Sequence, residues 1–595
     1  MHFSKLISAA LCGALVSLFA VAALADETAP DDSLRTTAER SGYVRTGRYD
    51  EVEHLCAAFA QRYPQAVRCI EFGRTPEGRP MLALIASTVG ALTPDQVRLQ
   101  KLPVLLVQGG IHAGEIDGKD AGFLALRELL DGQLAAHALD RFTLVFVPVF
   151  NVDGHERFGH WNRPNQVGPE EMGWRTTAQN LNLNRDYMKA DAPEMQALLR
   201  LMNDWDPILS VDLHVTDGAK FQHDVSIQLE PAYGGDPQLR NTGIALRSAL
   251  VAKLRTQGSL PLTFYPSFVV DDDPASGFVD LPPTPRFSSG YPALRNRFGM
   301  LVETHSWKDY ATRVRVTHNT LVDLFEQAAQ HGAEWLNNAH AADALATQLG
   351  GQTVVLDYQV SDKTRTVDFL GYAYSRSPSE ISGALMTRYD DSQPQVWHLP
   401  LRDDVQPKLS ITAPRLGYLI PAAHADWLAQ KLDLHGIRYQ RLDAAQPQRA
   451  VQTFRASSVK FAAETFEGHT LVSLNGTWAD EIRDIGAGAL FVPIAQPHAR
   501  LAMALLEPQA PDSLAAWGFF SNAFEQKEYM EDYVAEDVAR SQLAHDPALA
   551  AEFNRRLGAD AEFRASPQAR LDFFYKRSPS YDERLNLYPV MRIER

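Results

Sequence analysis

The sequence predicts an α/β fold for the N-terminal half of the chain, with a mixed, mostly parallel sheet sandwiched by helices. Three observations support this prediction. Short apolar runs alternate with segments of helical spacing over residues 40–348. The runs are continuously apolar, which is typical of strands covered on both faces. A glycine pair at 109–110 ends one of these runs, as expected where a buried strand gives way to a turn.

The elements of this half follow from the spacing of apolar residues. A helix is predicted at 51–63, where apolar residues recur every three or four positions, and another at 192–202, with Pro193 in its first turn. The predicted strands, in chain order, are 80–86, 103–108, 143–150, 207–213 and 299–302. Two further helices are predicted at 119–130 and 316–337.

The pattern changes after residue 350. Residues 350–500 carry many β-like runs together with a small αβ unit at 417–442, and they predict a β-rich accessory domain. Residues 501–595 include a long acidic, alanine-rich stretch and predict a helical C-terminal segment. No internal repeat is visible, and no cluster of residues in this part indicates chemistry.

Composition narrows the possible functions. The chain has 595 residues, a length that corresponds to about two to four domains. It is 45% hydrophobic and 22% charged, which excludes disordered and collagen-like proteins. A formal net charge of −16 argues against a nucleic-acid partner. Three cysteines exclude a disulfide-dense scaffold and a cysteine-rich metal module.

The first 25 residues have the pattern of a cleavable signal peptide. Lys5 precedes an uncharged apolar stretch at 6–24, and small residues flank a cleavage site after Ala25. We therefore expect a secreted or periplasmic protein with no membrane attachment after cleavage; the alternative is a retained membrane anchor. An oxidising compartment would allow Cys56 and Cys69 to pair, but the sequence leaves open whether they do.

Polar residues gather where the predicted strands end. In open α/β sheets, ligands bind at the carboxyl ends of the strands. His112 and Glu115 follow the second predicted strand on one glycine-rich turn, His214 ends the fourth, and Glu303 ends the fifth. Two imidazoles and one carboxylate make a three-ligand zinc site with a position left open.

The remaining polar residues suggest roles in hydrolysis. Glu303 supplies a second carboxylate, which could act as a base toward water at the metal. Asn184 and Arg185 supply an amide and a planar cation suited to hold a substrate carboxylate. The structural alternatives are that His214 is a core histidine, with His223 or His305 as its rivals, and that Glu303 pairs with Arg295 or Arg297. Arg185 has the alternative of pairing with Asp186 or Asp191.

A His-x-x-Glu pair is by itself a weak signal. The chain holds a second one, His331 to Glu334, inside a predicted helix, and we interpret it as surface. The first pair gains weight from its place after a strand and from its glycine-rich turn.

Taken together, the motifs resemble those of the zinc carboxypeptidases of the carboxypeptidase A type. The series is Gly-x-His-Ala-Gly-Glu at 110–115, Asn-x-Asp-Gly at 151–154 and Asn-x-Asn-Arg at 182–185, followed by the strand-end histidine and glutamate. The resemblance covers about residues 43–340. It implies one zinc ion per chain, and it assigns the matching residues as follows: His112, Glu115 and His214 as ligands, Glu303 as the catalytic carboxylate, Asn184 and Arg185 as the pair that binds the terminal carboxylate.

The resemblance also implies an arginine that stabilises the oxyanion. Arg163 and Arg175 both fall in the expected interval, and Arg163 is favoured, with Arg175 as the alternative or as a substrate-binding residue. Tyr291 is a candidate to cap the substrate; the alternative is that it only packs in the core. One departure is Asn182, which stands where the family often has an aspartate that orients a zinc-bound histidine.

The expected function is zinc-dependent hydrolysis of the C-terminal peptide bond of a peptide with a free terminal carboxylate. A zinc deacylase or cell-wall peptide amidase on the same scaffold is the first alternative, because it would use the same metal and base. A second alternative, from another class, is a non-enzymatic protein that binds peptides or glycans through its C-terminal half. The sequence fixes neither the side-chain preference nor the oligomeric state.

Overall fold

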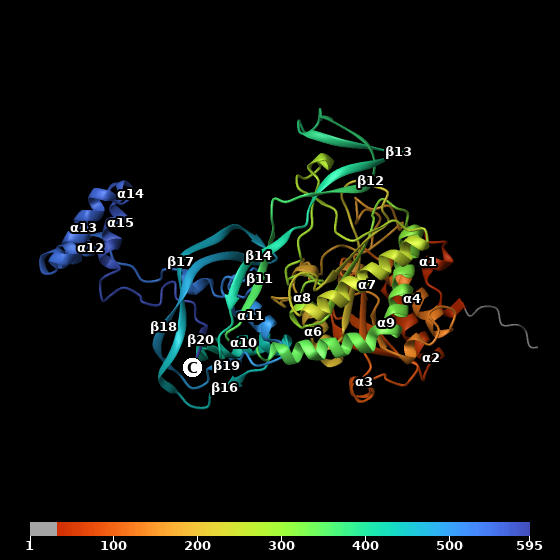
Figure 1. Ribbon diagram of the computed structural model, residues 1–595, viewed down its shortest axis with the longest axis horizontal. Coiled ribbons are helices and arrows are strands. Elements are labelled where there is room, and N and C mark those ends of the chain that lie inside the picture. Colours follow the sequence, from red (N-terminus) through yellow and green to blue (C-terminus); the bar gives the residue numbers. More distant parts are fainter. Residues whose placement is uncertain (1–31) are drawn as a thin grey trace, which may run out of the picture.

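The computed structural model describes residues 32–595 and contains an N-terminal α/β part, a β-rich part and a small group of C-terminal helices (Figure 1). The predicted signal peptide and its cleavage site after Ala25 lie outside the described residues. Within residues 32–595, no helix combines the length and the apolar composition needed to cross a bilayer.

The N-terminal part is built on a mixed sheet of eight strands. Parallel pairing links β4, β3, β5 and β10. Strand β1 pairs antiparallel with β2, β2 with β4, and β6 with β10, whereas β7 pairs parallel with β6. Every residue of β3 and β4 is buried, which requires cover on both faces of the sheet. The predicted α/β class is therefore confirmed. The strands in spatial order are β1 (Val67–Arg74), β2 (Pro80–Ala86), β4 (Thr143–Val147), β3 (Val104–Gly109), β5 (Leu209–Val215), β10 (Phe298–Thr304), β6 (Val225–Glu230) and β7 (Pro261–Leu262).

Helices cover this sheet, and the four helices named from the sequence all form. The last of them is longer than its predicted range of 316–337, because α9 continues at both ends. The 20-residue helix α7 was not recognised from the sequence; its N-cap is Asp236. The main helices are α2 (Tyr49–Arg62), α4 (Asp117–Leu130), α6 (Pro193–Trp205), α7 (Pro237–Thr256) and α9 (Tyr310–Ala346).

Two short strands of the N-terminal part join a sheet that belongs mostly to the β-rich part. Strand β13 pairs parallel with β9, which also pairs with β8, so segments separated by more than a hundred residues share one sheet. The order of this sheet is β12 (Arg365–Pro378), β13 (Leu385–Arg402), β9 (Phe278–Val279) and β8 (Ser267–Phe268). A separate pair consists of β11 (Thr353–Val360) and β14 (Val405–Thr412).

The rest of the β-rich part centres on a six-stranded sheet with a long hairpin. Strands β17 and β18 form this hairpin, whose tip lies at 466–469. The strands in spatial order are β16 (Gln440–Arg441), β19 (Leu490–Pro493), β15 (Gly417–Ile420), β20 (Met591–Ile593), β17 (Gln446–Phe466) and β18 (His469–Ile485). The helices α10 (Ala422–Leu434) and α11 (Ala499–Leu506) also belong to this part.

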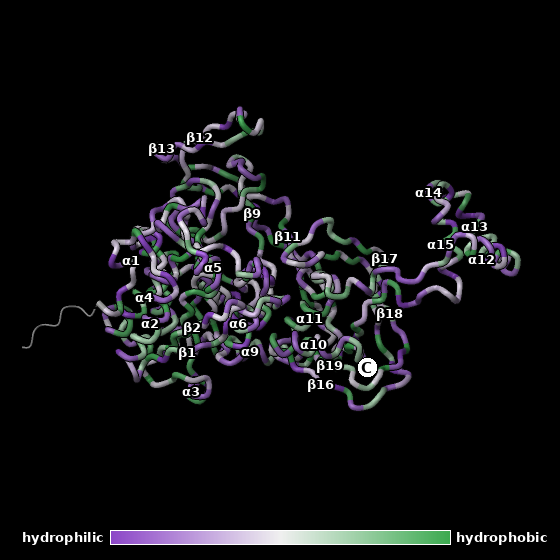
Figure 2. Tube along the Cα trace, turned by 180° about the vertical axis from the view of Figure 1, so that it is seen from behind, coloured by the Kyte–Doolittle hydropathy of each residue, from purple (hydrophilic) through white to green (hydrophobic). Residues whose placement is uncertain are grey.

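The segment expected to be helical, 501–595, contains helices over 532–575 but ends in a strand. Residues 591–593 form β20, which is buried and pairs with β15; three residues are too few to show a strand pattern in sequence. The four helices lie apart from the rest of the fold in both views (Figures 1 and 2) and have their own apolar cluster around Phe563 and Phe573. They are α12 (Asp532–His545), α13 (Pro547–Ala559), α14 (Ala561–Ala565) and α15 (Pro567–Tyr575).

The cysteine pair that the sequence left open is bonded. Cys56 of α2 and Cys69 of β1 form a disulfide, with their Cα atoms 5.4 Å apart. The bond ties α2 to an edge strand of the sheet that it covers.

Candidate metal centre

Three residues from two neighbouring strand ends converge at one edge of the main sheet. His112 and Glu115 lie on the turn after β3, which is tight because the Glu115 N–H donates to the His112 carbonyl at 2.8 Å. His214 lies near the end of β5, which pairs with β3 in parallel register. Because the carboxyl ends of parallel neighbours meet at the same edge, the turn and the histidine come together.

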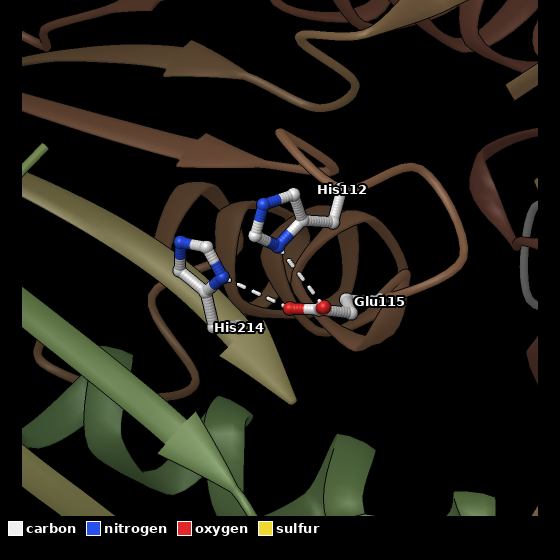
Figure 3. A group of neighbouring side chains, drawn as sticks. All are labelled: His112, Glu115 and His214. Atoms are coloured by element: carbon white, nitrogen blue, oxygen red, sulfur yellow. Dashed lines mark hydrogen bonds and ion pairs between the residues drawn. The ribbon is translucent and has the colours of Figure 1, made fainter. Parts of the chain in front are cut away.

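The three side chains form a compact group of metal donors (Figure 3). His112 Nδ1 lies 3.0 Å from Glu115 Oε1, and His214 Nδ1 lies 2.9 Å from Glu115 Oε2. All three residues are buried, and one ligand atom from each lies within 4.8 Å of the others. This is the set that the sequence predicts as ligands, and the structure brings it together.

The outer nitrogens of the two imidazoles show which atoms face the metal position. His112 Nε2 lies 3.0 Å from Asn182 Oδ1, and His214 Nε2 lies 2.6 Å from Asp212 Oδ2. In the metal-binding tautomer of each ring, Nε2 carries the proton and donates to this oxygen, and Nδ1 directs its lone pair at Glu115. The lone pairs of two nitrogens and a carboxylate face one another here, and a cation between them would stabilise this arrangement. The donor set therefore fits zinc.

Burial and neighbouring charges shift the pKa values of these groups. Burial lowers the pKa of His112 to about 4, which keeps its ring neutral and able to bind a metal at neutral pH. Burial opposes the charged form of His214 as well, but Asp212 and Glu115 raise its pKa well above the ordinary value. The uncharged amide of Asn182 exerts no such effect on His112.

Glu303 lies beside the ligands without being one of them. It is in β10, directly opposite His214 in the parallel register of β5 and β10. Burial raises the pKa of its carboxyl to about 8. Its Oε2 is buried and has no hydrogen-bond partner among the described residues. A free carboxylate next to a metal position has the placement required of a general base.

The two candidate arginines have different positions. Arg163 is 8% exposed, and its guanidinium lies behind Glu115, 2.8 Å from Oε1. Against the opposing effect of burial, this arginine holds the pKa of Glu115 well below its usual range. Arg175 lies 3.2 Å from the same oxygen but lines the cavity, with 38% of its side chain exposed. Of the two candidates for the oxyanion arginine, Arg175 lines the cavity, whereas the preferred Arg163 does not.

The ligands open into a cavity of about 510 Å³. Arg185 and Asn184, the predicted carboxylate-binding pair, line it. The guanidinium of Arg185 stacks over Phe287 at 4.4 Å and donates to the Asn184 carbonyl at 2.7 Å, and it forms no ion pair with any residue in 32–595. The backbone N–H of Asn184 donates to Asn182 Oδ1 at 3.0 Å, and this hydrogen bond fixes the position of Asn184. An unpaired guanidinium in a cavity is suited to bind an anion.

Tyr291 is not part of this cavity. It is fully buried in the short helix α8 (Tyr291–Leu294), and its hydroxyl donates to His435 Nδ1 at 2.9 Å. The expectation that it caps the substrate is therefore wrong, and its packing role is the correct alternative. The tyrosine that lines the cavity is Tyr265, which precedes β8. Its segment shows neither periodicity nor a motif, so no sequence signal pointed to it.

Comparison with known proteins agrees with the geometry. The sequence model of the zinc carboxypeptidase family matches residues 52–226. Carboxypeptidase B of Helicoverpa zea is 26% identical over 174 residues, which are 27% of this chain and only 39% of that protein. Carboxypeptidase 2 of Trichophyton rubrum is 22% identical over 466 residues, which are 75% of this chain and 79% of that protein.

Solved structures overlap with about half of the chain. The metallo-carboxypeptidase from Burkholderia cenocepacia has 18% identity and a TM-score of 0.33, and the match covers 46% of this chain and 68% of that one. Bovine thrombin-activatable fibrinolysis inhibitor, in complex with tick carboxypeptidase inhibitor, has 14% identity and a TM-score of 0.36, with coverage of 49% and 99%. Residues 52–226, which include the three metal ligands, thus match the zinc carboxypeptidase family.

Proposed function

We propose that this protein is a zinc carboxypeptidase that hydrolyses the C-terminal bond of peptides with a free terminal carboxylate. One observation carries the proposal: Arg185, a cavity guanidinium with no ion pair in the described chain, shares its cavity with the metal-ligand triad and with the free carboxylate of Glu303. A site with a base, a metal position and an anion-binding group has the parts needed to cleave next to a terminal carboxylate.

The residues have distinct roles in this proposal. Zinc held by His112, Glu115 and His214 supplies a Lewis acid that polarises the scissile carbonyl and acidifies water. Glu303 accepts the proton of the attacking water at its unpartnered Oε2 and returns it to the leaving amine. Arg175 donates to the oxygen that becomes negative as the carbonyl is attacked.

The carboxylate end of the substrate is held by two further groups. Arg185 and Asn184 bind and orient the terminal carboxylate, so that the adjacent bond lies at the metal position. Arg163 stays behind Glu115 and keeps this ligand ionised.

A substrate panel tests the proposal. The purified protein should cleave an N-blocked dipeptide with a free carboxylate at least about 100-fold faster in kcat/KM than its C-terminal carboxamide, because a charge-assisted contact contributes roughly 3 kcal/mol. Chelation should abolish the release of the terminal amino acid, and added zinc should restore it. Turnover of acylated amino acids alone would instead identify a deacylase, and binding without turnover would identify a binding protein.

We also propose that the mature protein is exported. The signal-like N-terminus and the bonded Cys56–Cys69 pair support this, since disulfides persist in oxidising compartments. Fractionation of the source cells, followed by N-terminal sequencing of the mature protein, should find Asp26 first in the exported fraction. A cytosolic protein that retains Met1 would contradict the proposal.

A further inference from the structure

The cavity is lined from one part of the chain and supported from another. Its lining residues all fall within 112–303, so no described residue after 350 forms its wall. Residues after 350 nevertheless contact segments that carry wall residues. One such segment is β9, which pairs with β13. Two further contacts support the loops around Asn184, Arg185 and Phe287.

The first supported loop is 182–191, which carries the carboxylate-binding pair. Asn182 N–H donates to Glu467 Oε2 at 2.8 Å, and His469 Nε2 donates to Asp191 Oδ2 at 2.7 Å. Glu467 and His469 flank the tip of the β17–β18 hairpin. Asn182 links this loop to the metal centre, because its side-chain oxygen contacts His112 Nε2 and also accepts from the backbone N–H of Asn184.

The second supported loop carries the aromatic ring under Arg185. Arg286 donates from its backbone N–H and from Nε to the two oxygens of Asp512, at 2.9 and 2.6 Å. Asp512 is buried, and the next residue after Arg286 is Phe287, whose ring lies under the Arg185 guanidinium. The loop and its ring are thus fixed by one backbone hydrogen bond and one ion pair to Asp512.

The contacts that support these two loops matter because few contacts hold the Arg185 side chain itself. Without an ion pair among the described residues, Arg185 is held by its own backbone, by a contact with the Asn184 carbonyl and by the Phe287 ring. A long side chain held so loosely gains precision only if the segments on both sides of it are rigid.

We propose that Glu467 and Asp512, both outside the cavity, are positioning residues that hold Asn184, Arg185 and Phe287 in place for the substrate's terminal carboxylate. The inference rests on the proposed carboxypeptidase function. It assigns a role to the β-rich part: this part completes the carboxylate end of the cavity from behind, without touching the substrate.

The negative charge of Glu467 and its hydrogen bond to Asn182 have opposite expected effects on the binding of a substrate carboxylate. Its negative charge lies near Arg185, so removing the charge alone should strengthen the binding of a substrate carboxylate. Removing the hydrogen bond to Asn182 should weaken that binding, because the loop is released. Glu467→Gln removes the charge and keeps an acceptor oxygen, whereas Glu467→Ala removes both. Glu464→Ala, at an exposed position on the same hairpin, is the matched control.

Steady-state kinetics at saturating zinc separate these effects. With the free-carboxylate dipeptide, Glu467→Ala should raise KM about tenfold with kcat within twofold of wild type. Glu467→Gln should have a KM equal to wild type or lower, and Glu464→Ala should match wild type. With the carboxamide, none of the three should change kcat/KM by more than about twofold. A KM for Glu467→Ala that stays unchanged, or that falls together with that of Glu467→Gln, would overturn the inference.

Hydrogen exchange tests the same inference without turnover. In the full-length protein, backbone amides of 182–192 should exchange faster in Glu467→Ala than in Glu464→Ala, and those of 284–290 should exchange faster in Asp512→Asn. Unchanged exchange in both loops would refute the positioning role even if the enzyme is active. A wild-type protein that cleaves no peptide would refute the proposed function instead, and the exchange measurement would still decide the inference.

Discussion

Replacing Glu303 by glutamine is expected to lower kcat by about a thousandfold while zinc stays bound, because general base catalysis contributes roughly 10²–10⁴-fold. Glutamine keeps the size of the side chain and its place on β10 opposite His214, but it cannot accept the proton of the attacking water. Steady-state kinetics with the free-carboxylate dipeptide, together with metal analysis, measure both effects.

The pH dependence of kcat/KM also tests the role of Glu303 as the base. The base must be deprotonated, so kcat/KM of the wild type should fall as the pH drops through the Glu303 pKa. Burial raises that pKa to about 8, and the positive charge of a bound zinc would lower it from there, so the acid limb should lie below pH 8.

A partly buried acid on the neighbouring strand provides the control. Glu230 ends β6, and burial raises the pKa of its carboxyl to about 7, but it does not line the cavity with the metal ligands. Glu230→Gln should retain kcat within about twofold. If Glu303→Gln kept a rate near wild type, or if both variants lost activity equally, Glu303 would not be the base.

Replacing His214 by alanine should remove the metal. Two protein donors then remain at a site that zinc occupies with three, and Glu115 loses the imidazole that faces its Oε2. We expect less than about a tenth of the wild-type zinc content after dialysis and a loss of kcat/KM of at least a thousandfold, since the Lewis acid is lost with the metal.

Thermal unfolding gives a second measure of the same change. Zinc at 100 times its Kd should stabilise the wild type by about 2.7 kcal/mol, and the resulting shift in Tm should be absent from His214→Ala. His331→Ala is the control, because His331 belongs to the other His-x-x-Glu pair, on the exposed side of α9. A His214 variant that retained zinc and its Tm shift would contradict the assignment of this ligand.

The metal centre could be predicted from sequence because each of its residues follows a local signal. A continuous apolar run marks a buried strand, and a glycine-rich turn marks its end. Since parallel strands end at one edge of the sheet, His112, Glu115, His214 and Glu303 were expected to meet there, and the structure places all four together.

Other assignments depended on side-chain direction, which no local pattern records. Arg163 and Arg175 lie in the same irregular loop region, and only the folded chain shows that one supports Glu115 from behind while the other faces the cavity. Likewise, only the folded chain shows that Tyr291 is buried and that Tyr265 lines the cavity. Segments without periodicity give no indication of which face a side chain takes.

The sequence by itself determined the α/β class, the strand ends and the residues that converge on the metal, because these follow from periodicity and turn chemistry within about ten positions. Only the tertiary structure decided how distant segments support one another. Glu467 contacts Asn182 across 285 positions, and strand β13 pairs with β9 in one sheet. Such contacts arise when separately formed units pack together, and their pairing is set by shape and charge across the interface.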